Sequence, residues 1–141
     1  MTVFTNKRHG SDPSTLETTS LNSLTSTGTV TGAAFSNDGY MFADFELNIT
    51  YGTNPTAGSI IQLALLRSID GGSTYEDAPG DGGVVGGFVL AATTSAQKLT
   101  VRVANLPPGH FKPYIAAKTT GQTAASSGNT LKMTRFTPEG T

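Results

Sequence analysis

Residues 41–51, MFADFELNITY, decide the fold class. One face of this segment is apolar or aromatic, at Met41, Ala43, Phe45, Leu47, Ile49 and Tyr51. The alternate positions are mostly polar, with Asp44, Glu46, Asn48 and Thr50. Alternation of this kind predicts a β-strand that lies with one side on a core and the other in water.

Further strand signals follow on the C-terminal side. Residues 59–69 are apolar on both faces and predict a central strand that is covered from both sides. Residues 97–104 alternate again, and Pro113 within residues 110–118 predicts an edge strand or a bulge. Residues 80–87 hold five glycines and predict a flexible loop. About seven to nine short strands with Gly, Pro and Asn turns favour an all-β fold, an antiparallel β-sandwich of jelly-roll or Greek-key type.

The N-terminal segment differs from the rest of the chain. Residues 1–36 are polar and rich in Thr and Ser, with thinly spread apolar residues that cannot cover a core alone. We therefore expect an extended N-terminal arm, or one or two edge strands, over residues 1–36, and a β-sandwich domain over residues 37–141. The first eight residues lack the apolar run of a signal peptide, and no segment approaches 18 apolar residues. This predicts a soluble protein that is made in a cytoplasm and does not enter a membrane.

Charge is unevenly distributed along a chain whose net charge is −1. Residues 37–81 hold seven acidic residues against one arginine, and residues 82–141 hold six basic residues against one glutamate. Either acidic strands lie beside basic strands within one monomer, or two opposed patches bind other subunits. The overall balance does not favour direct binding of nucleic acid.

No catalytic or cofactor motif is visible. Cysteine is absent, and neither His9 nor His110 has a carboxylate or hydroxyl partner at a recognisable spacing. The glycines of residues 80–87 are not followed by the Gly-Lys-Ser/Thr of a phosphate-binding loop. The acidic residues between 70 and 81 do not match a calcium-binding loop, and we expect solvated carboxylates there. We therefore expect a protein that is not an enzyme and has no cofactor and no metal site.

One short motif is distinctive. Residues 68–75, SIDGGSTY, resemble the Asp-box, Ser-x-Asp-x-Gly-x-Thr-Trp, of sialidases and other β-proteins, with Tyr75 in the place of Trp. In those families the Asp side chain bonds the backbone of a turn, and the aromatic ring packs below it. A single copy therefore implies a hairpin and not glycosidase activity.

Several segments, in order along the chain, resemble a family of phage proteins. They are FELNITYGTNPTAG (45–58), LLRSIDGGSTY (65–75), TSAQ (94–97), LPP (106–108) with FK (111–112), GQ (121–122) and SGNTL (127–131). Together, over roughly residues 41–136, they resemble the cement, or head decoration, proteins of tailed double-stranded DNA bacteriophages.

The resemblance implies a structural protein of the virion that binds the outside of the phage head. Its partner would be the major capsid protein, and it would bridge capsomers and stabilise the shell. Self-association is expected, as a dimer first and a trimer second. We expect contacts with the capsid or with other copies at Phe4, Lys7, Arg8, Phe111, Lys112 and Tyr114. The alternative is a tail-fibre or baseplate β-sandwich module that binds glycans of the host surface.

Overall fold

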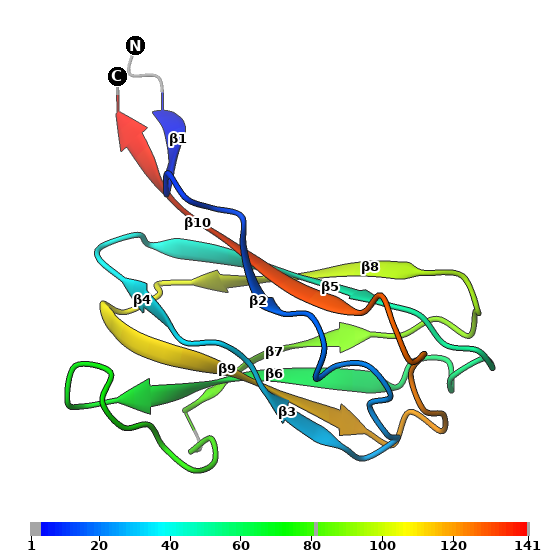
Figure 1. Ribbon diagram of the computed structural model, residues 1–141. Helices are drawn as coiled ribbons and strands as arrows, with labels where there is room; N and C mark the ends of the chain where they lie inside the picture. The colour runs from blue at the N-terminus through cyan, green and yellow to red at the C-terminus, as the bar shows by residue number, and fades with distance from the viewer. Residues whose placement is uncertain (1–3, 81, 141) are drawn as a thin grey trace.

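The computed structural model describes residues 4–80 and 82–140, and the side chains of residues 7–80 and 82–138 (Figure 1). Within these ranges no residue is helical, and none belongs to a helix long and apolar enough to cross a bilayer. The strands are β1 (Phe4–Arg8), β2 (Ser14–Glu17), β3 (Thr29–Thr31), β4 (Phe35–Asn37), β5 (Phe42–Ile49), β6 (Ile60–Ser68), β7 (Val84–Val89), β8 (Gln97–Ala104), β9 (Gly109–Lys118) and β10 (Thr130–Gly140).

Two antiparallel sheets pack face to face and make a β-sandwich, as the sequence predicts. In sheet A the strand order is β1-β10-β5-β8, and β2 also pairs with β10. In sheet B the order is β3-β9-β6-β7, and β4 also pairs with β9. The partners are nested along the chain: β2 pairs with β10, β3 and β4 with β9, β5 with β8, and β6 with β7.

Strand β5 lies in the middle of sheet A and follows the predicted alternation. Phe45, Leu47 and Ile49 are fully buried in the core, and the intervening residues are half-buried on the outer face. Met41 departs from the prediction, because the strand begins only at Phe42 and the Met41 side chain is 47% exposed. The Met41 carbonyl instead accepts a hydrogen bond from the Leu106 N–H.

Strand β6 lies between β9 and β7 and is the predicted central strand of its sheet. Leu63 and Leu65 face the core, while Ala64 and Leu66 on the opposite face are also buried. Cover on both sides is therefore confirmed for the middle of the strand. It fails at the beginning, where Ile60 is 41% exposed.

The edge-strand alternative predicted from Pro113 is wrong, because β9 is an inner strand. Across Pro113 the register does shift by one residue, from Thr31 opposite Tyr114 to Phe35 opposite Phe111. It pairs with β6 along one side and with the short strands β3 and β4 along the other. The Pro113 carbonyl accepts a hydrogen bond from the Gly32 N–H, in the interruption between β3 and β4. A residue's N–H and C=O point to the same side of a strand, so the missing proline N–H faces this gap in the ladder.

The predicted loop over residues 80–87 is shorter than expected, because β7 begins at Val84. A Cβ atom at Gly86 would lie 2.5 Å from Val101 Cγ1 of the opposite sheet. Glycine here permits close packing between β7 and β8, so its presence does not signal a flexible backbone.

Residues 14–37 contribute strands and core side chains to both sheets. Strand β2 extends sheet A, while β3 and β4 extend sheet B. Five apolar side chains of this segment are buried in the core, at Leu16, Leu21, Leu24, Val30 and Phe35. The division of the chain at residue 36 stays a prediction.

Candidate functional site

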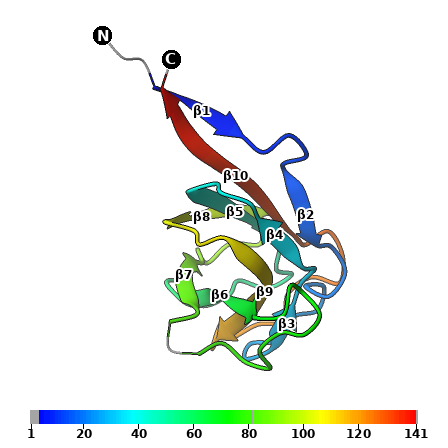
Figure 2. The ribbon, with the colours of Figure 1, turned by 90° about the vertical axis from the view of Figure 1, so that its left-hand side faces the viewer.

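The ribbon, which we define as β1 together with residues 136–140 of β10, extends beyond the sandwich. Phe136 is the last residue of β10 that pairs with β5, opposite Phe42, whereas the pairing with β1 continues to Gly140. Figures 1 and 2 show this pair of strands projecting away from both sheets, with the two chain ends at its tip. Lys7 and Arg8 lie in the ribbon with exposed side chains. The ribbon is thus available to a partner that approaches that end of the molecule.

A buried ion pair lies at the base of the ribbon. Leu131 and Met133 face the core, and Arg135 is the next residue on the same face of β10. Its guanidinium donates to Asp12, with Nε 3.0 Å from Oδ2 and Nη2 2.8 Å from Oδ1. The relative exposure of the two side chains is 7% for Arg135 and 0% for Asp12. Such a bidentate contact fixes the orientation of both groups.

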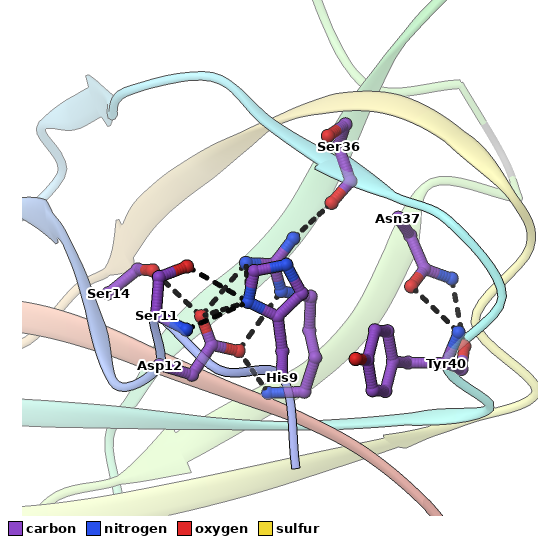
Figure 3. A network of polar contacts seen from close by, with 8 residues as sticks. His9, Ser11, Asp12, Ser14, Ser36, Asn37 and Tyr40 are labelled. Atoms are coloured by element: carbon purple, nitrogen blue, oxygen red, sulfur yellow. Dashed lines mark hydrogen bonds and ion pairs between the residues drawn. The ribbon is translucent and has the colours of Figure 1, made fainter.

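The Asp12 carboxylate also binds groups besides the guanidinium (Figure 3). Its Oδ2 accepts the backbone N–H of Arg135 at 2.6 Å, and its Oδ1 accepts the Ser14 hydroxyl at 2.8 Å. Burial by itself raises the pKa of Asp12. The hydrogen bonds from Arg135 and Ser14 and the positive charge of Arg135 outweigh this effect, so the pKa lies below its usual value.

Arg135 joins the two sheets. Its backbone belongs to β10 of sheet A, and its Nη1 donates to the Ser36 carbonyl in β4 of sheet B. Its Nη2 lies 3.2 Å from His9 Nδ1, and the His9 N–H donates to the Arg135 carbonyl. The His9 ring also meets the Tyr40 ring edge-on, with centroids 5.3 Å apart. We call Asp12, Arg135 and their partners His9, Ser14 and Ser36 the anchor.

His9 does have hydroxyl and carboxylate neighbours, contrary to the sequence analysis. Ser11 Oγ lies 2.9 Å and Asp12 Oδ1 3.6 Å from His9 Nδ1. Both contacts involve the same ring nitrogen, whereas a Ser-His-Asp relay uses the two different nitrogens of the ring. Asp12 is moreover bound to Arg135. The geometry therefore fits an anchor and does not match a nucleophilic triad.

The outer face of sheet A carries charges of both signs, and one ion pair there joins neighbouring strands. Asp44 accepts two hydrogen bonds from Arg102, at 2.8 and 2.9 Å. Glu46 lies opposite Lys132 in the register of β5 and β10. For these strands the first alternative is therefore confirmed: acidic β5 lies between basic β8 and basic β10 in one monomer. Charges of opposite sign lie close together on this face, which weakens the field that it presents to an ionic partner.

The Asp-box forms the expected turn. Asp70 Oδ1 accepts the N–H groups of Ser73 and Thr74 at 3.1 and 2.9 Å, and Asp70 Oδ2 accepts the Thr74 hydroxyl. These bonds hold the pKa of Asp70 far below its usual value. The Tyr75 ring lies 4.5 Å from Lys112 Nζ, over the outer face of sheet B. No strand follows near Tyr75, so the motif closes a loop and not a regular hairpin.

The predicted contact residues do not form one surface. Phe4 has its backbone in β1, but its side chain lies outside the described part of the chain. Phe111 is 3% exposed and packs near Phe35, so it belongs to the core and offers no surface to a partner. Lys112 and Tyr114 are half-buried on the outer face of sheet B, whereas Lys7 and Arg8 lie in the ribbon of sheet A.

The anchor was missed by the sequence analysis, although one signal pointed to it. The inward row Leu131, Met133, Arg135 ends in a charged residue, and a buried arginine requires a partner. The partner, Asp12, is 123 positions away, so no local spacing indicates it.

The described residues hold no group of three or more His, Cys, Asp or Glu side chains that is placed to bind a metal ion. Asp81, part of the acidic segment, lies outside the described residues. A scan against protein-family models and a search of curated proteins both found nothing that matches this chain.

Proposed function

We propose that the chain is a structural cement protein of a tailed phage, which binds the outside of the major capsid shell and bridges neighbouring capsomers. The observation that carries the proposal is the anchored ribbon. An isolated pair of β-strands is marginally stable in water. Here a buried ion pair fixes the base of such a pair to both sheets, while the rest of it extends past the sandwich. This arrangement suits a projecting element that lies on a neighbouring subunit.

The strand order supports the same role. We infer a jelly roll, because the N-terminal strands pair with the C-terminal strands in nested order, from β2 with β10 inward to β6 with β7. A two-layer scaffold of this kind, packed on one core, is rigid. Cement subunits gain strength from many copies that each contribute modest contacts, so a rigid scaffold with one docking element suffices.

Binding to heads that lack the protein tests the proposal. Deletion of residues 1–14 would also remove Asp12 and leave Arg135 buried without its partner. A sharper variant removes only residues 1–8, which takes away β1 and retains the anchor. A second variant, Arg8→Glu, keeps the ribbon and reverses one exposed charge. Lys132→Glu is the matched control, because Lys132 is also exposed but lies on the face of sheet A.

The assay is co-sedimentation with heads of the phage that encodes the chain. We expect the deletion to weaken binding at least about tenfold, Arg8→Glu to weaken it less, and Lys132→Glu to bind like the wild type. Unchanged binding by the deletion variant would reject docking through the ribbon. Failure of the wild type to bind heads, together with its recovery from purified tails, would replace the cement function by the tail-fibre or baseplate alternative.

A further inference from the structure

Strand β7 is an edge strand with an open hydrogen-bonding side. It pairs with β6, and no strand of the described chain lies on its other side. The Leu90 N–H donates to the Ser59 carbonyl, towards β6. Because successive N–H groups of a strand point to opposite sides, those of Val89 and Gly87 point outward. This edge therefore presents donors and acceptors to another strand.

Several other edges carry features that discourage strand addition. Edge strand β8 contains Lys98 and Arg102, and β3 and β4 are only three residues long. In the ribbon, Pro138 lies opposite Asn6 of β1. The Arg135 carbonyl faces β1, because it accepts the His9 N–H, and backbone groups alternate sides along a strand. The backbone of residue 138, which lacks an N–H, therefore faces the side away from β1. Charges, short strands and prolines are the usual protection of β-edges.

Strand β7, with the sequence VVGGFV, has neither a charge nor a proline. A bulge disturbs its first residues, but Gly86 to Val89 pair regularly with β6. Its exposed side chains are apolar: Val84 is 46% and Val89 57% exposed, and Ile60 lies directly opposite Val89 and is 41% exposed. These are three of the five large apolar side chains that are exposed in the described chain, and they gather along this one edge.

Charges at the two ends of β7 are opposite in sign. Glu76 and Asp77 precede the strand and outnumber the exposed Arg67, whose carbonyl accepts the Glu76 N–H. At its other end, Lys118 lies in the same cross-strand row as Ile60 and Val89, and Lys98 is the second residue of β8, just after the connection from β7. An antiparallel copy of the same strand would place the acidic end of each molecule beside the basic end of the other.

We propose that a second copy of this chain pairs antiparallel with β7, so that two B sheets form one continuous sheet across a two-fold axis. An antiparallel strand is its own complement about such an axis, and two-fold dimers are the commonest closed assemblies. The pairing satisfies the outward N–H and C=O groups, covers Val84 and Val89, and brings opposite charges together. It involves neither the ribbon nor the anchor, so it is independent of capsid binding.

Sedimentation velocity of the purified full chain over micromolar concentrations tests this inference. Val89→Lys replaces an exposed apolar side chain that the pairing would cover by a charged one. Val89→Pro removes an outward N–H that the monomer does not use. The matched control is Met41→Lys, which makes the same change at an exposed apolar residue outside β7.

We expect a reversible dimer for the wild type and for Met41→Lys. For both Val89 variants we expect the dimer Kd to rise roughly tenfold or more, because each substitution acts twice in a symmetric dimer. Circular dichroism spectra that match the wild type verify that the variants are folded. A monomeric wild type, or a dimer that both Val89 variants leave unchanged, overturns the proposal whether or not the chain binds phage heads. Weak association by Met41→Lys as well would overturn it in favour of an interface elsewhere.

Discussion

Replacing Asp12 by alanine removes one partner of the buried ion pair and leaves the other in place. The Arg135 side chain is 7% exposed, so its charge cannot regain water unless the base of the ribbon opens. Among the described residues, its guanidinium would keep the Ser36 carbonyl and His9 Nδ1 as acceptors. The variant also leaves the Arg135 N–H and the Ser14 hydroxyl without their acceptor. Loss of one member of such a pair costs about 3–5 kcal/mol of the free energy of unfolding.

This magnitude is measurable by urea unfolding. With a slope of about 2 kcal/mol per molar urea, we expect the midpoint of Asp12→Ala to fall by roughly 1.5–2.5 M. A double-mutant cycle with Arg135→Met separates the ion pair from other effects. Since methionine removes the buried charge, the double variant should be more stable than the sum of the two single losses implies.

Two results would contradict the predicted stabilisation by the Asp12–Arg135 pair. A midpoint shift for Asp12→Ala below roughly 0.5 M would mean a loss of about 1 kcal/mol, which is the value of an exposed pair. Additive losses in the double-mutant cycle would likewise show that Asp12 and Arg135 do not stabilise each other. Either outcome would refute the view that the anchor holds the base of the ribbon.

Two further predictions concern pH and packing. The pKa of Asp12 is lower in the folded chain than its usual 3.8, so the stability that ionised Asp12 contributes is complete above that value and is lost as pH falls through the folded pKa. The stability difference between wild type and Asp12→Ala in urea should therefore shrink at acid pH, and a constant difference would contradict this. Gly86→Ala should cost about 1–3 kcal/mol in thermal or urea unfolding, because the new Cβ would press on Val101. Gly52→Ala, whose Cβ would meet nothing within 4 Å, should change stability by no more than about 0.5 kcal/mol.

Local alternation accounts for the parts of the fold that the sequence predicts well. The faces of β5 follow from a period of two, which is a property of the strand alone. The same reasoning fails at Pro113, because its place in an inner strand depends on a gap between β3 and β4, which lie far away in the chain. It also fails at Gly86, where the requirement for glycine comes from Val101 on the other sheet.

The candidate site was predicted only in part, and for a similar reason. The sequence shows that Lys7 and Arg8 belong to a polar N-terminal segment. Their position in a projecting ribbon, however, depends on the pairing of β1 with the far end of the chain. Phe111 was predicted to contact a partner, yet it occupies an inward position of β9 between half-buried neighbours. Sequence composition indicates which residues could contact a partner, and only the register of a strand decides on which face they lie.

The anchor lies where force on the ribbon would reach the sandwich, since β1 is held by its pairing with β10. Force applied to β1 passes to β10 through their hydrogen-bonded ladder. If β10 were held in sheet A alone, the load would act on the edge of its pairing with β5, beginning at Phe136. Arg135, the residue immediately before it, has its backbone in sheet A and its guanidinium on the Ser36 carbonyl of sheet B. Force on the ribbon would therefore act on both layers of the sandwich, because peeling β10 away from β5 would also break the bond from Arg135 to Ser36.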